Sequence, residues 1–284
     1  MVNETGPIGM EERDATTRNL AWLAGVLLCQ LLAFWDSWSW LARRAAQAAG
    51  DMAGLLAVVA VTACLVVFSV MSKRRIVRFS LVPQVVLLLI YGASYWLWPT
   101  PPIFKAAIAM LCVFLTLHRG VFGRRPPPAY WGMVLCALPV VPSLQFYLGY
   151  PARLISAGLT VPLLRMNGLS VHREGTYLVW QDQQIQFDAP CSGITMLWAG
   201  VLLTFTLAYL RNFTGLETLR ALGVCAVLVL FGNVLRAGSL FYLETGIVTP
   251  AAPWWHEGVG VAVFIGIAAV LVAVLNRWKT CSPV

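Results

Sequence analysis

The chain has 284 residues, of which 59% are hydrophobic and only 11% are charged, and its mean hydropathy is +0.75. A soluble domain is nearer half apolar and a quarter charged, so this composition excludes an ordinary soluble protein. The formal net charge of +8 does not indicate nucleic-acid binding, because the basic residues cluster in short loops between apolar runs, where membrane topology is encoded. The N-terminal segment 1–19 is polar and partly acidic, and it lacks the basic start and short apolar stretch of a cleavable signal.

Apolar runs of roughly 18 or more residues recur along the chain and predict membrane-spanning helices. We expect eight of them, near 20–38, 52–72, 79–98, 103–118, 129–148, 191–210, 218–242 and 255–275. The Pro-rich stretch "WPTPP" predicts a tight turn before the fourth span, which is short. Pro139 and Pro142 predict a kink in the fifth, because each removes a backbone hydrogen-bond donor.

The Lys and Arg residues of the short loops predict the orientation of these spans. With eight spans, most of these residues fall on one side: segments 73–78 and 118–125, Arg211 with Arg220, and Arg277 with Lys279. By the positive-inside tendency this side and both termini are cytoplasmic, and segments 150–190 and 243–254 face outward. Arg43 and Arg44, after the first span, are the one conflict.

The outward segment 150–190 is the one sizeable stretch that we do not expect to span the membrane. Residues 150–166 mix apolar side chains with two arginines, which is typical of a helix lying in the outer interface. The following residues alternate apolar and polar, and the turn signals "REGT" and "QDQQ" divide them into three short strands. The predicted fold is therefore an all-α polytopic membrane protein with a small extracytoplasmic β-cap between spans five and six.

Cys191 differs in location from the other six cysteines. Five of them lie inside apolar spans, where cysteine packs as a small hydrophobe, and one lies in the C-terminal tail: Cys29, Cys64, Cys112, Cys136, Cys225 and Cys281. Cys191 alone lies at an outer membrane boundary. Because no second outward cysteine is present to pair with it, we do not expect a structural disulfide.

The run Pro-Cys-Ser-Gly at the start of the sixth predicted span favours a reactive thiol. Asp188 is expected to cap the helix and Pro190 to occupy its first position. Cys191 would then lie in the first turn, where free N–H groups and the helix dipole stabilise a thiolate. Ser192 and Gly193 are expected to leave space for a substrate backbone. The alternative is a small residue that eases helix packing.

Two further polar positions fall near the outer ends of the next two spans. Arg236 lies roughly 9 Å inside the end of the seventh span, where an arginine costs a few kcal/mol unless it meets water, a partner or a ligand. Asn233, one turn earlier, is placed to hold its guanidinium. Snorkelling of Arg236 toward the interface is the alternative interpretation.

His256 opens the eighth predicted span, preceded by Trp254 and Trp255 as interfacial anchors. A boundary histidine alone is more often structural than catalytic. The stretch "HEGVG" lacks the second histidine of a zinc-protease helix, so we expect no metal and no cofactor. The predicted topology nevertheless puts Cys191, Arg236 and His256 at one outer level on three consecutive spans. Together they supply a nucleophile, an oxyanion stabiliser and a general acid and base.

Three motifs in this order and context resemble the exosortase/archaeosortase family of membrane transpeptidases. They are "PCSGI" at the start of one span, "NVLR" near the end of the next, and a histidine opening the last. The resemblance covers roughly residues 130–275 and implies a Cys-Arg-His active site at the outer face of the membrane. We therefore expect one integral membrane domain over 1–284, with a catalytic part at 129–275 and N-terminal spans of unassigned role at 1–128.

The resemblance also implies the substrates and the location. Such enzymes act on exported proteins that carry a C-terminal sorting signal, with a Pro-Glu-Pro-type motif, a transmembrane helix and a basic tail. By this analogy Cys191 forms a thioester with the substrate, His256 transfers protons, and Arg236 stabilises the oxyanion or orients the substrate. The acceptor amine would belong to a membrane lipid or another molecule of the cell envelope. The expected location is the cytoplasmic (inner) membrane, with the active site on its extracytoplasmic side.

Two other functions are compatible with the same residues. A non-enzymatic transporter or scaffold for envelope polymer or lipid export would use Arg236 as a ligand for an anionic substrate, and Cys191 would then be incidental. A membrane protease would resolve the thioester with water instead of an amine. Replacement of Cys191 separates the first alternative from catalysis, and mass spectrometry of the processed C-terminus separates hydrolysis from transfer.

Overall fold

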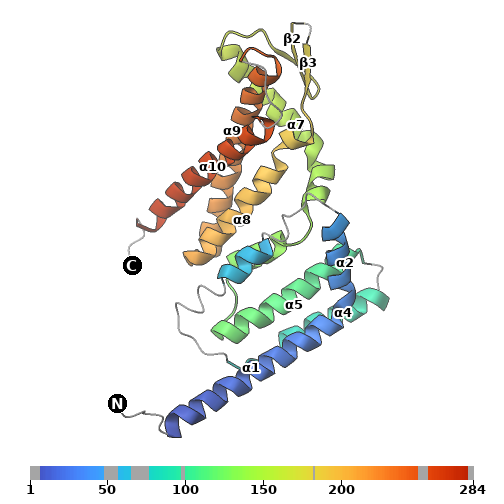
Figure 1. Cartoon of the computed structure of the whole chain (residues 1–284), viewed down its shortest axis with the longest axis vertical. Helices are drawn as coiled ribbons and strands as arrows, with labels where there is room; N and C mark the ends of the chain where they lie inside the picture. The colour runs from blue at the N-terminus through green and yellow to red at the C-terminus, as the bar shows by residue number, and fades with distance from the viewer. Residues whose placement is uncertain are drawn as a thin grey trace. The chain divides into compact units, whose positions relative to one another are not determined.

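The computed structural model describes residues 7–47, 57–64, 77–96, 100–181, 183–248 and 255–280. The chain divides into two compact units, Met1–Pro139 and Val140–Val284, which are described separately below as unit 1 and unit 2. Nearly all regular structure is helical, with one small sheet in unit 2 (Figure 1).

In unit 1 the helix α5 is the central element. The named helices of this unit are α1 (Pro7–Ala33), α2 (Trp35–Gln47), α4 (Val82–Trp96), α5 (Pro102–Phe122) and α6 (Pro128–Cys136), and residues 57–64 are also helical. α5 packs against the other four named helices. It begins with Pro102 in its first turn and ends at Phe122, and the next residue, Gly123, has a φ of 65° in the left-handed region that ends helices.

The first predicted span, 20–38, is not one straight helix. α1 ends at Ala33 and α2 begins at Trp35, and the two helices are bent by 72° at this break. Phe34, at the break, is fully buried and packs in a cluster with Tyr91, Ala109 and Cys112. Burial of this ring inside unit 1 anchors the bend, which periodicity within the apolar run did not reveal.

His118 is also placed differently from the prediction of a loop residue. It lies within α5, is fully buried, and its ring contacts those of Phe122 and Tyr130, each at 4.8 Å between centroids. The predicted short span 103–118 is thus a helix of 21 residues that continues to Phe122. The apolar residues Val121 and Phe122 extend the helix beyond the polar pair His118-Arg119.

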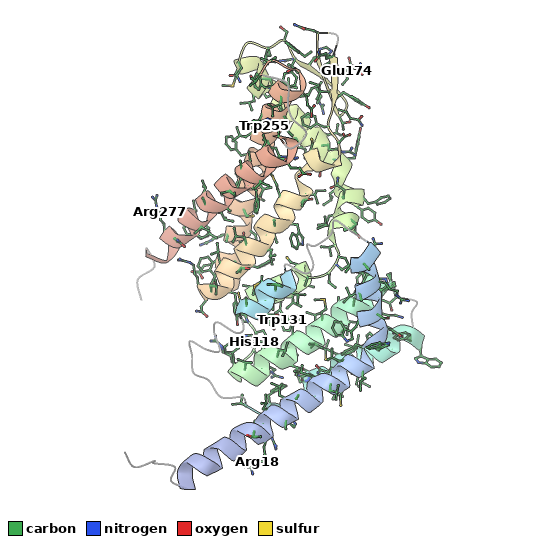
Figure 2. The ribbon with its side chains drawn as sticks, viewed as in Figure 1. Arg18, His118, Trp131, Glu174, Trp255 and Arg277 are labelled. Atoms are coloured by element: carbon green, nitrogen blue, oxygen red, sulfur yellow. The ribbon has the colours of Figure 1, made fainter. Side chains whose placement is uncertain are left out.

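Unit 2 contains the region that sequence analysis assigned to the site. Its elements are α7 (Val141–Met166), β1 (His172–Glu174), β2 (Tyr177–Trp180), β3 (Gln183–Gln186), the 3₁₀ turn η1 (Ala189–Ser192), α8 (Ile194–Leu210), α9 (Gly215–Glu244) and α10 (Trp255–Thr280). α9 packs against α7, α8 and α10, and η1 packs against α7, α8 and α9. Figure 2 shows Trp255 and Glu174 toward one end of this unit and Arg277 toward the other.

The fifth predicted span, 129–148, is broken between Cys136 and Val141. The break includes Pro139, which has no N–H to continue a helical ladder, so the kink expected from the prolines is a complete interruption. The second half of that span joins the predicted interfacial helix 150–166, because α7 runs without interruption from Val141 to Met166.

The predicted β-cap is confirmed as a three-stranded antiparallel meander. β1 pairs with β2 and β2 with β3, with His172 opposite Val179 and Tyr177 opposite Gln186. Leu178, in the central strand, is fully buried in the main core of unit 2, against which Trp180 and Ile185 also pack. The sheet therefore covers this core with one face, as the alternating pattern predicted.

The described residues do not confirm eight membrane spans, because fewer helices qualify as candidates. Three helices are long and apolar enough to cross a membrane, at Pro102–Phe122, Gly215–Glu244 and Glu257–Trp278, and the number rises to five if each of two bent helix pairs is one span. α4 and α8 are apolar but shorter, with 15 and 17 residues. The predicted span 52–72 falls mostly outside the described residues.

Candidate active site

Cys191 lies in a 3₁₀ turn that precedes α8, not in the first turn of α8 as predicted. Its backbone N–H donates to the carbonyl of Asp188 at 2.9 Å. Asp188 occupies the cap position of this turn, but its exposed side chain makes no capping bond. Gly193, with φ of 73°, then separates the turn from α8. The thiol is thus one short turn outside the helix and does not lie at its N–H groups.

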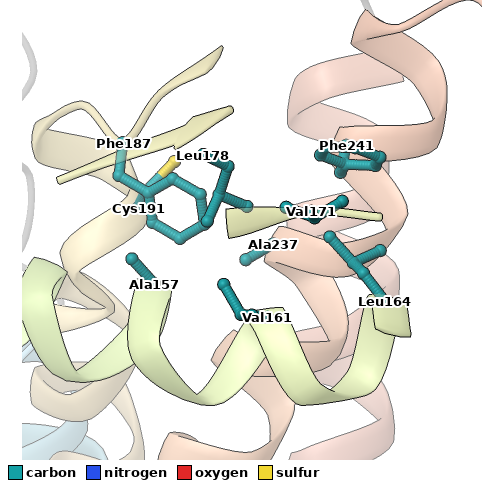
Figure 3. Close-up of a cluster of buried hydrophobic side chains, with 9 residues drawn as sticks. All are labelled: Ala157, Val161, Leu164, Val171, Leu178, Phe187, Cys191, Ala237 and Phe241. Carbon is teal, nitrogen blue, oxygen red and sulfur yellow. The ribbon is translucent and has the colours of Figure 1, made fainter. Parts of the chain in front are cut away.

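The Cys191 side chain is buried in the apolar core of unit 2. It is 9% exposed and belongs to a cluster that includes Ala157 of α7, Leu178 of β2, Phe187 and Ala237 of α9 (Figure 3). This burial raises the pKa of the Cys191 thiol, and the nearby charge of Arg236 lowers it by less. Burial therefore opposes the predicted thiolate, and the helix dipole is not placed to stabilise it. A thiol with a raised pKa requires a base to act as a nucleophile.

Asn233 holds the turn that carries Cys191. Its side-chain Nδ2 donates to the carbonyl oxygen of Cys191 and to Oγ of Ser156 on α7, both at 2.8 Å. The Asn233 side chain is 2% exposed, so both bonds are shielded from water. These bonds take the place of the predicted contact with the guanidinium of Arg236. Asn233 on α9 thus connects α7 with the turn η1 that carries Cys191. It is a positioning residue.

Residue 193 must be a glycine because it lies in close contact with Asn233. A Cβ at residue 193 would lie 2.8 Å from Cγ and 3.0 Å from Nδ2 of Asn233. The expected open space for a substrate backbone beside Gly193 is therefore filled by the asparagine. The left-handed φ of 73° adds a second reason, because a residue with a Cβ is strained there.

Replacement of Gly193 by alanine is expected to destabilise unit 2 more than the backbone conformation alone explains. The left-handed conformation costs about 1–2 kcal/mol and the contact with Asn233 adds about 1–3 kcal/mol. Gly246→Ala is the matched control, because Gly246 has a similar φ of 69° and open space at its Cβ. We expect thermal unfolding of the purified protein to show a clearly larger fall in Tm for Gly193→Ala. Equal falls would contradict the packing argument.

Ser192 and two residues of α7 complete the support of the turn. Ser192 Oγ donates to Oε1 of Gln145 at 2.9 Å and accepts from the backbone N–H of Ile194 at 3.3 Å. Gln145 and Ser156 are separated by eleven residues, or three helical turns, and so lie on one face of α7. Sequence reasoning did not single out these two polar residues. Their common face on α7 is the signal that identifies them.

Arg236 lies one turn after Asn233 on α9 and is 7% exposed. Its side chain runs against Gly260 of α10, where a Cβ would lie 3.1 Å from the guanidinium Nε. His256 is the second residue of α10, four residues before Gly260, and therefore lies on the same face of that helix. The His256 side chain is outside the described residues. The backbone thus brings the first two turns of α10 against Arg236, whose charge also acts on Cys191.

Metal-binding residues do not gather at this site in the described part of the chain. No group of three or more His, Cys, Asp or Glu side chains that could hold a metal ion is found there. His172, on the exposed strand β1, lies with its Nε2 3.5 Å from a carboxylate oxygen of Glu174.

Comparison with known proteins agrees with the motifs quoted above. The model of the transmembrane exosortase family (Exosortase_EpsH) matches residues 16–273, nearly the whole chain. Searches of curated proteins and of solved structures returned no match. The matched region covers most of both units and contains Cys191, Arg236 and His256. This chain belongs to the transmembrane exosortase family.

Proposed function

We propose that this protein is a membrane cysteine transpeptidase that removes the C-terminal sorting signal of exported proteins and transfers them to an amine acceptor in the cell envelope. The observation that carries the proposal is the arrangement of Cys191. Asn233 holds its carbonyl at 2.8 Å, and Arg236, one turn further along the same helix, acts on its thiol by its charge. A buried thiol next to a buried arginine favours attack on a carbonyl over a packing role.

The proposed reaction has two steps in which protons and bonds balance. The His256 imidazole takes the thiol proton, the sulfur of Cys191 bonds to the scissile carbonyl carbon, and the carbon–nitrogen bond breaks as the imidazolium returns that proton to the leaving amine. The acceptor amine then attacks the thioester, gives a proton to His256, and releases the thiolate, which takes that proton back. Arg236 donates to the oxygen that becomes negative in both steps.

The raised pKa of Cys191 supports a role for a base. Because burial favours the neutral thiol, the proton must leave when the carbonyl is attacked, and an imidazole is a suitable acceptor at neutral pH. The backbone of α10 supports His256 in this role, since residue 256 shares a face with Gly260, against which Arg236 packs.

The proposed substrate is an exported protein with a Pro-Glu-Pro-type motif, a transmembrane helix and a basic tail, as in the family resemblance. We place the enzyme in the cytoplasmic (inner) membrane with Cys191 on the extracytoplasmic side. The loop charges support this orientation: Arg211 and Arg277 lie at the end of α8 and near the end of α10, which is the end opposite to Cys191 and His256.

The experiment that tests the proposal is co-expression with an exported reporter that carries such a C-terminal signal. We expect the wild-type protein to shorten the reporter and Cys191→Ala to leave it full-length. Cys225→Ala is the matched control, because Cys225 is a buried cysteine of the same unit that lies within α9. Immunoblotting reports cleavage, and mass spectrometry of the new C-terminus reports whether an amine or water was the acceptor.

The outcomes separate the candidate functions. A C-terminus joined to an amine supports transpeptidation, and a free carboxylate supports the membrane protease. Cleavage that persists in Cys191→Ala at wild-type levels contradicts both. If Cys191→Ala retains a role in envelope polymer or lipid export while Arg236→Ala loses it, the transporter or scaffold replaces the enzyme.

A further inference from the structure

Unit 1 contains a cavity that the transpeptidase chemistry does not use. It has a volume of about 480 Å³ and lies among α1, α4 and α5. Its lining is almost entirely apolar and includes Trp22, Val26, Phe34, Leu81, Val85 and Leu88. None of the described residues that line it has a charged side chain. A cavity of this size and character is typical of sites for small apolar molecules, which range over about 300–1,000 Å³.

Two glutamines interrupt the apolar lining. Gln30 of α1 is 8% exposed and Gln84 of α4 is 4% exposed, so both are more than nine-tenths buried. Neither amide atom of Gln84 has a hydrogen-bond partner among the described residues, and the same is true of Oε1 of Gln30. The cavity therefore presents one amide donor and two carbonyl acceptors that the protein does not satisfy.

The two glutamines are held beside one turn of α5. Nε2 of Gln30 donates to Oγ1 of Thr116 at 2.8 Å, and Thr116 in turn donates to the carbonyl of Cys112 at 3.0 Å. The Cys112 thiol lies 3.8 Å from the backbone carbonyl of Gln84. These contacts fix the position of Gln30 and of the Gln84 backbone, and leave the Gln84 amide available.

Unsatisfied amides are unfavourable in this environment. Burial of a polar group without a hydrogen-bond partner costs its full desolvation free energy. An apolar membrane region has no water that could replace the lost hydrogen bonds. A leucine at residue 84 would avoid that penalty, so a ligand that supplies the missing hydrogen bonds is the simplest physical role for the Gln84 amide.

We propose that this cavity binds a neutral, membrane-soluble molecule with an apolar chain and a hydroxyl group. The chain would fill the apolar lining, and the hydroxyl would donate to a glutamine Oε1 and accept from Nε2 of Gln84. A phosphate or a carboxylate does not fit, because no cation lines the cavity to offset its burial. The site belongs to unit 1, whereas Cys191 belongs to unit 2, and the proposal does not depend on the transpeptidase activity.

The proposal is tested with photoactivatable probes on the purified full-length protein. The probes are dodecanol, dodecane and dodecyl phosphate, each carrying a diazirine on the chain. After irradiation, peptide mapping by mass spectrometry locates the adducts. We expect dodecanol to label the α1 and α4 peptides that line the cavity, and the other two probes to label them about tenfold less, as the loss of a net hydrogen bond implies.

Matched glycine variants test the location of the site. Gly25 lines the cavity, and a Cβ there meets no atom within 4 Å, so Gly25→Leu adds a side chain to the cavity from a position with open space. Gly92 is an exposed helical glycine of the same unit with the same open space, and it does not line the cavity. We expect Gly25→Leu to abolish labelling by dodecanol and Gly92→Leu to keep it.

Gln84→Leu tests the recognition of the hydroxyl. We expect labelling by dodecanol to fall about tenfold to the level of dodecane, while the Tm of the protein without probe rises because an unsatisfied amide is removed. Labelling that is equal for dodecanol and dodecane in the wild type, stronger for dodecyl phosphate, or unchanged in Gln84→Leu overturns the proposal. A fall in the Tm of Gln84→Leu without probe also contradicts it, since the amide would then have a structural role.

Discussion

Replacement of Arg236 by glutamine is expected to lower the rate of sorting-signal cleavage by roughly a hundredfold to a thousandfold. Removal of one preorganised donor to a developing oxyanion has an effect of this size in enzymes that form tetrahedral intermediates. The charge of Arg236 also lowers the pKa of Cys191, so its loss leaves the thiol harder to ionise. Both effects act in the same direction, and reporter cleavage over time in co-expressing cells measures their sum.

A second measurement separates the electrostatic effect from a loss of folding. Alkylation of Cys191 by iodoacetamide, followed by peptide mass spectrometry, reports the thiolate fraction at each pH. Because Arg236 lowers the Cys191 pKa, the midpoint of this profile is expected to move to higher pH in Arg236→Gln.

Arg220→Gln is the matched control. It removes an exposed arginine from the same helix, about 24 Å along its axis from Arg236, and is expected to change neither cleavage nor the alkylation profile. Wild-type cleavage by Arg236→Gln would contradict a role for Arg236 at the oxyanion.

Replacement of Asn233 by alanine is expected to lower both stability and activity. The carbonyl of Cys191 loses its buried donor, which costs about 1–3 kcal/mol, and Ser156 loses its partner. A shift of the nucleophile by about 1 Å reduces the rate of reaction by roughly a hundredfold. Thermal unfolding measures the first effect and reporter cleavage the second. Asn167→Ala is the control, because it removes one exposed bond to Tyr242 in the same unit.

A double-mutant cycle with Gly193 tests whether Asn233 acts through the Cys191 turn. The Cβ of Gly193→Ala meets Cγ and Nδ2 of Asn233, and Asn233→Ala removes both atoms. Gly193→Ala is therefore expected to cost less in the Asn233→Ala background, with a coupling of about 0.5–3 kcal/mol. Additive losses in the two variants would show that Asn233 does not support this turn.

Much of unit 2 follows from local sequence patterns. Alternation and two turn signals predicted three strands between residues 172 and 186, because side chains of a half-buried strand alternate between two environments. The apolar runs predicted α9 and α10 with bounds close to those observed. Helices that satisfy their own backbone hydrogen bonds can be recognised from one segment at a time.

The elements that the sequence did not predict depend on contacts between segments. Periodicity within residues 20–38 does not reveal the bend at Phe34, which follows from burial of this ring with Tyr91 and Cys112 of other helices. The apolar character of α8 predicted a complete span, but this helix has 17 residues. Its short length follows from Gly193 and the turn before it, which composition alone does not reveal.

The sequence by itself singled out Cys191, Arg236 and His256 as candidate catalytic residues, because each is a polar or nucleophilic residue near the end of an apolar run. Only the tertiary structure decided how the thiol is held. Asn233 of α9, which is 42 residues from Cys191 in the chain, donates a hydrogen bond to the carbonyl of Cys191. Gln145 of α7 accepts a hydrogen bond from Ser192. The raised pKa of the thiol likewise follows from burial by the β-cap and α7, because desolvation depends on what covers a group and not on its neighbours in the chain.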